Sequence, residues 1–202
     1  MKDPGDHRIC FVGDSFVQGT LDPECRGWVG RVAAAARARG FDVTAYNLGV
    51  RRDTSRDVRA RWEAECRARL PAGCAGHVVF SFGANDATLE EGRPRVGEEE
   101  STANLAAVLA AARTHYAVRV VGPPPVGDAE QDERILRLCA RYAETAAELD
   151  IPYLPLAAKL AEDPVWRNEV AASDGSHPGA AGYRLIASLV LAWPSWWFGP
   201  AP

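Results

Sequence analysis

Short apolar runs alternate with longer stretches of helical spacing along most of the chain. Five of these runs are apolar almost throughout, as expected of strands that helices cover on both faces. They span residues 8–13, 42–48, 77–82, 118–122 and 151–155. Regular alternation of such runs with helical segments is typical of β-α units, and it predicts a mostly parallel five-stranded sheet.

The segments between the runs carry the helical pattern. In one of them a single apolar stripe recurs at three- and four-residue spacing, formed by Leu105, Val108, Leu109 and Ala112. Helices are predicted over residues 27–39, 55–69, 98–115, 128–149 and 178–192. Strands and helices in this order predict an α/β fold with three layers, an α/β/α sandwich.

Length and composition favour one domain. The chain has 202 residues, 47% of them hydrophobic, which is enough for one well-buried core. We expect a single domain over residues 1–202, with its core at about 8–192 and an aromatic tail at 193–202. The tail holds three of the six tryptophans. It is expected to pack against the domain or against a second subunit as a homo-oligomer; contact with a substrate or a membrane surface is the alternative.

Net charge and cysteine content limit the kinds of partner and the cellular compartment that we expect. A net charge of −4 offers no general attraction to nucleic acid or to anionic membranes. The five cysteines are scattered, without a C-x-x-C pair, and the first residues lack the apolar region of a secretory signal. The apolar stretch 185–198 is broken by Pro194 and falls short of the roughly 20 residues that span a bilayer. We therefore expect a cytoplasmic protein without integral membrane association.

Residues that could take part in catalysis or binding follow the predicted strands. Ser15 comes after the first strand, Gly49 after the second and Asn85 after the third, and His177 precedes the last helix. In open parallel sheets, ligands bind in the crevice outside the carboxyl ends of the strands. The pattern therefore predicts that four separate stretches meet in one crevice.

A serine turn follows the first strand, in the segment Gly13-Asp14-Ser15-Phe16-Val17-Gln18-Gly19. A tight turn can hold the Ser15 hydroxyl toward the crevice, with the Ser15 N–H directed at a bound oxyanion. The alternative is an ordinary strand-to-helix turn in which Ser15 caps a helix.

A second motif, Asp174-Gly175-Ser176-His177-Pro178, precedes the last helix. Asp174 can fold back to accept the Nδ1–H of His177, which leaves Nε2 free to take a proton from a serine. Pro178 is expected to start the helix. The alternative is a helix cap beside a surface histidine, and the serine turn makes that alternative much weaker.

Four blocks in order resemble the SGNH hydrolases, also called the G-D-S-L esterase/lipase family. The blocks are Gly13-Asp14-Ser15 with Gly19, then Asn47-Leu48-Gly49, then Gly83-Ala84-Asn85-Asp86, and finally Asp174-Gly175-Ser176-His177-Pro178. The resemblance covers residues 8 to 192. It implies a flavodoxin-like sandwich and a carboxylic ester hydrolase that forms an acyl-enzyme on Ser15, with His177 as base and acid and Asp174 orienting it.

The resemblance also implies an oxyanion hole built from the Ser15 N–H, the Gly49 N–H and the Asn85 side chain. Alternatively, Asn85 is a turn residue whose side chain forms a hydrogen bond with its own backbone. The neighbouring residues Asp14, Asn47 and Asp86 are interpreted as groups that tie the loops together.

No metal or cofactor is expected, because the other histidines, His7, His77 and His115, have no ligand spacing.

Two positions depart from the family pattern. Phe16 replaces the leucine of the G-D-S-L motif, where a packing role is expected. Arg52 stands where many relatives have a second glycine, next to Arg51. A guanidinium there can bind an anionic substrate group, although a pair with Asp53 or Asp57 is the more ordinary expectation.

The segment at about residues 87–97 is short and charged, which favours small or short-chain acyl esters as the small-molecule substrate. An acyltransferase that passes the acyl group to a sugar or alcohol remains open. A non-catalytic phosphate- or nucleotide-binding module is a further alternative, but it gives His177 and Asp174 no role.

Overall fold

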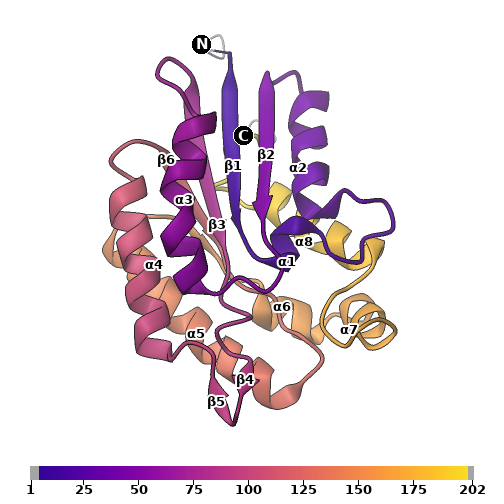
Figure 1. The fold of residues 1–202 in the computed structure, drawn as a ribbon. Helices are drawn as coiled ribbons and strands as arrows, with labels where there is room; N and C mark the ends of the chain where they lie inside the picture. The colour runs from indigo at the N-terminus through magenta and orange to yellow at the C-terminus, as the bar shows by residue number, and fades with distance from the viewer. Residues whose placement is uncertain (1–4, 200–202) are drawn as a thin grey trace.

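The computed structural model describes residues 5–199, and its centre is a five-stranded parallel sheet (Figure 1). The strand order is β2-β1-β3-β6-β7. Their bounds are His7–Gly13 for β1, Val43–Gly49 for β2, Ala75–Ser81 for β3, Ala117–Val121 for β6 and Tyr153–Leu154 for β7. The predicted α/β sandwich is confirmed, and each predicted apolar run overlaps a strand, although the last strand is only two residues long.

Helices cover both faces of the sheet. The long ones are α2 (Gly27–Ala38), α3 (Ser55–Arg69), α4 (Glu98–Ala112), α5 (Ala129–Glu148) and α8 (Ala180–Ala192). Helices α2 and α8 pack together on one face, whereas α3, α4 and α5 pack side by side on the other (Figure 1).

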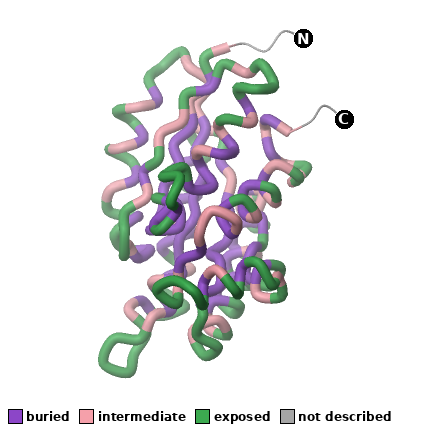
Figure 2. The backbone as a smooth tube through the Cα atoms, turned by 90° about the vertical axis from the view of Figure 1, so that its right-hand side faces the viewer, coloured by how far each residue is buried: buried purple, intermediate pink, exposed green. Residues whose placement is uncertain are grey.

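The alternation of side chains along β1 separates two cores. Ile9 and Phe11 point into the cluster under α2 and α8, while Cys10 and Val12 point into the cluster under α3 and α4. The predicted stripe on α4 is buried in the second cluster. Figure 2 shows buried backbone through the centre of the molecule and exposed backbone along the outer helices.

Several short elements were not predicted. They are α1 (Ser15–Gln18), α6 (Ala157–Glu162), α7 (Pro164–Ala171) and an antiparallel hairpin of β4 (Leu89–Glu90) and β5 (Arg93–Pro94). The expectation that Pro178 starts the last helix was wrong: α8 begins at Ala180, and Gly179 is its N-cap in an extended conformation. The hairpin lies within the charged segment at residues 87–97.

The aromatic tail packs against the protein's own core. Trp196 and Phe198 are buried, and the Phe198 ring centroid lies 5.1 Å from that of His7 at the start of β1. Arginines hold the tail backbone: Arg119 Nε donates to the Ser195 carbonyl oxygen at 2.8 Å. Residues 200–202 of the predicted tail lie outside the described residues. Association of subunits through the tail stays a prediction.

Candidate active site

The end of β1 turns directly into α1, and this turn positions Ser15. Asp14 is the N-cap of α1, and its Oδ1 accepts the Phe16 N–H at 2.9 Å. Ser15 is the first helical residue and not the cap. Gly13 is required at the turn because a Cβ there would lie 1.8 Å from the Ser81 carbonyl oxygen. The close approach of β3 therefore fixes the backbone just before the serine.

A chain of hydrogen bonds joins the two predicted motifs. His177 Nε2 lies 2.8 Å from Ser15 Oγ, and His177 Nδ1 lies 2.8 Å from Asp174 Oδ2. The other carboxylate oxygen, Asp174 Oδ1, accepts the backbone N–H groups of Ser176 at 3.0 Å and His177 at 2.9 Å. Gly175 adopts a φ of 79°, a left-handed conformation that lets Asp174 fold back on the histidine.

The environment keeps Asp174 ionised. Partial burial alone would raise the pKa of its carboxyl, but hydrogen bonds from the His177 backbone and ring and from the Ser176 N–H outweigh it and lower the pKa. An ionised carboxylate at Nδ1 favours the tautomer with its proton on that nitrogen. His177 Nε2 is then left as the acceptor that faces Ser15.

A cavity of about 240 Å³ opens at this point. Its lining includes Ser15, His177, Asp174 and Asn85, together with three arginines, Arg51, Arg52 and Arg95. The predicted convergence of the strand ends is thus present for three of its four members.

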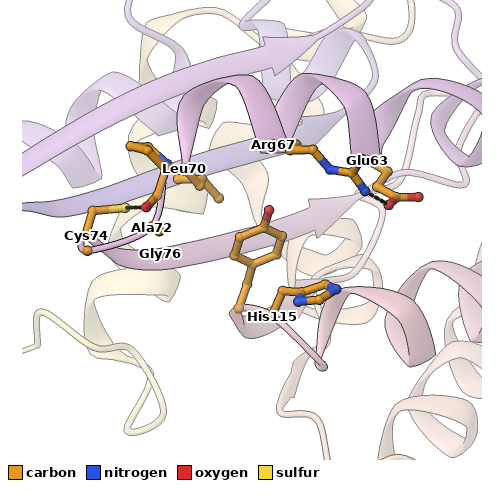
Figure 3. Close-up of a pocket in the computed structure, with 10 residues that line it drawn as sticks. Glu63, Arg67, Leu70, Ala72, Cys74, Gly76 and His115 are labelled. Carbon is orange, nitrogen blue, oxygen red and sulfur yellow. Dashed lines mark hydrogen bonds and ion pairs between the residues drawn. The ribbon is translucent and has the colours of Figure 1, made fainter.

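A larger cavity, about 550 Å³, lies elsewhere, between the end of α3 and the start of β3. Figure 3 shows its side chains, with Arg67 paired to Glu63 and the Cys74 thiol donating to a backbone carbonyl. No serine lines it, and the hydrogen-bonded Ser15, His177 and Asp174 all line the smaller cavity.

Gly49 has a different role from the one predicted. Its N–H donates to Asn47 Oδ1 at 3.0 Å, and Gly49 does not line the cavity. A Cβ at Gly49 would lie 2.1 Å from the backbone nitrogen of Gln18, so the glycine is needed where α1 packs on β2. Asn47 Nδ2 donates to the Val17 carbonyl oxygen at 2.8 Å. The pair therefore ties β2 to α1, as expected for Asn47 alone.

Asn85 does not form the turn bond to its own backbone that was its alternative interpretation. Its Nδ2 donates to the Asp53 carbonyl oxygen at 2.9 Å, across the cavity rim from another loop. The carboxylate of the next residue, Asp86, is fully buried, and its Oδ1 accepts the Ser55 N–H at 2.8 Å.

Asp86 Oδ2 accepts a short hydrogen bond from Ser101 Oγ, which lies 2.6 Å from the Tyr142 hydroxyl. This network joins the loop after β3 to α3, α4 and α5. In the sequence, Ser101 and Tyr142 lie outside the four motif blocks, so no motif predicted that they take part in this network.

Arg52 pairs with neither aspartate that was expected. Its Nη2 lies 3.1 Å from Glu90 Oε1 on the hairpin. Asp53 pairs instead with Arg61 at 2.7 Å, and Asp57 accepts the Thr54 N–H at the start of α3. Arg52 adopts a φ of 73°, a left-handed conformation that favours glycine.

The remaining histidines are not near this cavity. His7 Nδ1 lies 3.1 Å from His77 Nε2 near the amino ends of the inner strands β1 and β3, and His115 follows α4. Across residues 5–199 no cluster of three or more His, Cys, Asp or Glu side chains is arranged to hold a metal ion. Over the same span, no helix combines the length and the apolar character that crossing a membrane requires.

Burial of Asp14 predicts a pH-dependent stability. Burial raises the pKa of its carboxyl to about 7, although the Phe16 N–H opposes this, and Oδ2 has no hydrogen-bond partner among the described residues. The folded state therefore keeps this proton longer than the unfolded chain. The contribution of Asp14 to the free energy of unfolding is full below about pH 4 and is lost as the pH rises to about 7, a change of about 4 kcal/mol.

We expect Asp14→Asn, which keeps the Oδ1 acceptor, to remove this loss. Urea unfolding of both proteins across this pH range should show the variant gaining stability relative to the wild type as the pH rises. A difference in unfolding free energy that does not change with pH would contradict the assignment.

A serine, a histidine and an aspartate joined in this order, at the carboxyl ends of a parallel sheet, are the arrangement of a serine hydrolase. The comparison with known proteins gives the family. The chain belongs to the GDSL-like lipase/acylhydrolase family, whose model matches residues 11–185. The resemblance seen in the four sequence blocks is confirmed.

Solved structures agree with this fold. The lipase/acylhydrolase from Enterococcus faecalis is 27% identical and superposes with a TM-score of 0.76, covering 91% of this chain and 93% of that one. Axe2, an acetylxylan esterase from Geobacillus stearothermophilus, is 19% identical with a TM-score of 0.74, covering 95% of each chain. At that identity the second match supports the fold alone.

One curated relative is a Bacillus subtilis (strain 168) protein named uncharacterized lipoprotein YqeF. It is 29% identical over 117 residues, which are 55% of this chain and 45% of that protein. The matched region thus spans about half the length of the curated relative.

Proposed function

We propose that this hydrolase cleaves esters of small acyl groups through an acyl-enzyme on Ser15. The observation that supports it most is the pair of 2.8 Å contacts that joins Ser15, His177 and Asp174. His177 Nε2 takes the hydroxyl proton as Ser15 Oγ attacks the ester carbonyl carbon, and returns it to the leaving alcohol. Water, activated by the same histidine, then releases the acid. A phosphate-binding module gives this chain of hydrogen bonds no purpose.

The oxyanion hole is proposed to consist of the Ser15 N–H, the Asn85 side chain and the Arg52 N–H. Arg52 replaces Gly49 in this set, because the Gly49 N–H is already bonded to Asn47. Arg52 lines the cavity, and within the described residues its N–H makes no hydrogen bond. Its left-handed conformation is strained for a side chain other than glycine, and such strain is often found at functional sites.

Asn85→Ala tests the side-chain donor. Because the amide stabilises charge that appears only in the transition state, we expect kcat to fall by about a hundred- to a thousandfold, with KM changing far less. Steady-state kinetics on a chromogenic ester separates the two constants. A variant that loses affinity while keeping its kcat would show that Asn85 binds the ground state and does not stabilise the oxyanion.

The size of the cavity limits the acyl group. At about 240 Å³ it lies below the usual range for sites that enclose drug-sized ligands. We expect kcat/KM for 4-nitrophenyl esters to be highest between acetate and butyrate and to fall at octanoate and beyond. A rate that rises steadily with chain length would contradict the proposed preference.

We also propose that the protein works in the cytoplasm. All five cysteines are free thiols, three of them buried, which suits a reducing compartment.

A further inference from the structure

The cavity at Ser15 carries a local positive charge. Arg51, Arg52 and Arg95 line it, together with one carboxylate, Asp174. The chain as a whole has a net charge of −4, so the sign at the cavity is opposite to that of the protein. A cleft lined by one sign of charge attracts substrates of the other sign.

Two of the three arginines share one carboxylate. Arg52 Nη2 and Arg95 Nε both lie 3.1 Å from Glu90 Oε1, and Arg95 Nη1 also donates to the Arg52 carbonyl oxygen at 2.9 Å. Glu90 belongs to the hairpin β4–β5, which therefore holds both guanidinium groups at the rim. Arg95 also lies close enough to Asp57 and Asp86 for its positive charge to favour the ionised forms of both carboxyls. Glu90 is the one carboxylate that pairs with Arg52 among the described residues.

Arg51 has weaker contacts than either neighbour. Its Nη2 lies 3.9 Å from Asp174 Oδ2, beyond hydrogen-bonding distance, and that oxygen is already bonded to His177 Nδ1. The Arg51 side chain is 63% exposed, and among the described residues its guanidinium forms no hydrogen bond. A planar guanidinium with free donors matches the two oxygens of a carboxylate or a phosphate.

We propose that the natural substrate is an ester that also carries an anionic group, a carboxylate or a phosphate, and that Arg51 binds this group at the mouth of the cavity. Arg52 and Arg95 add attraction at longer range. This inference rests on the proposed function, because Arg51 selects among substrates for hydrolysis at Ser15.

Matched substrate pairs test the proposal. On the acyl side, 4-nitrophenyl hydrogen glutarate is compared with neutral 4-nitrophenyl pentanoate. On the alcohol side, 4-carboxyphenyl acetate is compared with neutral 4-carbamoylphenyl acetate. The readout is the ratio of kcat/KM for the anionic ester to that for its neutral partner. Any effect of Arg51 on the chemistry through Asp174 acts on both esters of a pair and cancels in the ratio.

We expect Arg51→Gln to lower this ratio by about tenfold in one of the two arms, the size of one lost charge-assisted hydrogen bond, and the arm affected identifies which side of the ester carries the charge. Arg51→Lys should retain part of the ratio. Arg113→Gln, which removes an exposed arginine at the far end of α4, should leave it unchanged.

A ratio equal to that of the wild type in both arms for Arg51→Gln would overturn the inference while Ser15-dependent hydrolysis of the neutral esters still stood. Neutral-ester turnover that survives Ser15→Ala would overturn the proposed function itself, so the two failures can be told apart.

Discussion

Replacing Ser15 with alanine is expected to lower kcat for a chromogenic ester by a factor on the order of 10⁶, with KM little changed. The reason is that Oγ is the atom that attacks, and no other hydroxyl lies within hydrogen-bonding distance of His177 Nε2 among the described residues. Ser15 is 3% exposed and its hydroxyl is bonded to the histidine, so the smaller alanine fits in its place without a clash. Initial rates with 4-nitrophenyl acetate, measured at high enzyme concentration, give the residual activity.

Ser195→Ala is the matched control, because it removes a hydroxyl from the tail, which does not line the cavity at Ser15, and it should leave kcat unchanged. Circular dichroism should show both variants folded. If purified Ser15→Ala hydrolysed the ester at the wild-type rate, Ser15 would not be the nucleophile.

Replacing His177 with alanine is expected to lower kcat by about the same factor as Ser15→Ala. Without the imidazole, the hydroxyl proton has no acceptor, and Asp174 has no ring to orient. Residues that act as one unit are not additive, so the Ser15→Ala/His177→Ala double variant should be no slower than either single variant. The same kinetic assay measures all three, with His115→Ala as the control at an exposed histidine outside the cavity.

The pH profile gives a second readout for His177. Only the neutral imidazole accepts a proton, so kcat/KM of the wild type should fall on acidification. Asp174 does not set this limb, because its lowered pKa keeps it ionised over that range.

A double variant far slower than either single variant would contradict the assignment of the two residues to one proton-transfer unit.

The fold could be predicted because its elements are locally encoded. The bounds of α3 agree with the prediction at both ends, since Thr54 and Asp57 form a capping box at its start. Helices α6 and α7 have 6 and 8 residues, too few for a clear apolar stripe. The start of α7 was still readable: Asp163 caps it, and Pro164 occupies its first turn.

The sequence predicted the local parts of the candidate site but not the contacts between distant segments. The Asp174-Gly175-Ser176-His177 motif is local, so its geometry follows from a few residues. The direction of the Gly49 N–H depends on a side chain two residues earlier, and the partner of Arg52 comes from a hairpin 38 residues away in sequence. Contacts of this kind are set by tertiary packing, which no short motif reports.

The most direct test of an activated nucleophile at Ser15 is intact-mass analysis after incubation with a fluorophosphonate. The serine oxygen bonds to phosphorus and fluoride leaves, so the mass rises by one phosphonyl group. A single adduct is expected on the wild type and none on Ser15→Ala. Equal labelling of both proteins, or an unlabelled wild type that still hydrolyses 4-nitrophenyl acetate, would contradict an activated nucleophile at Ser15.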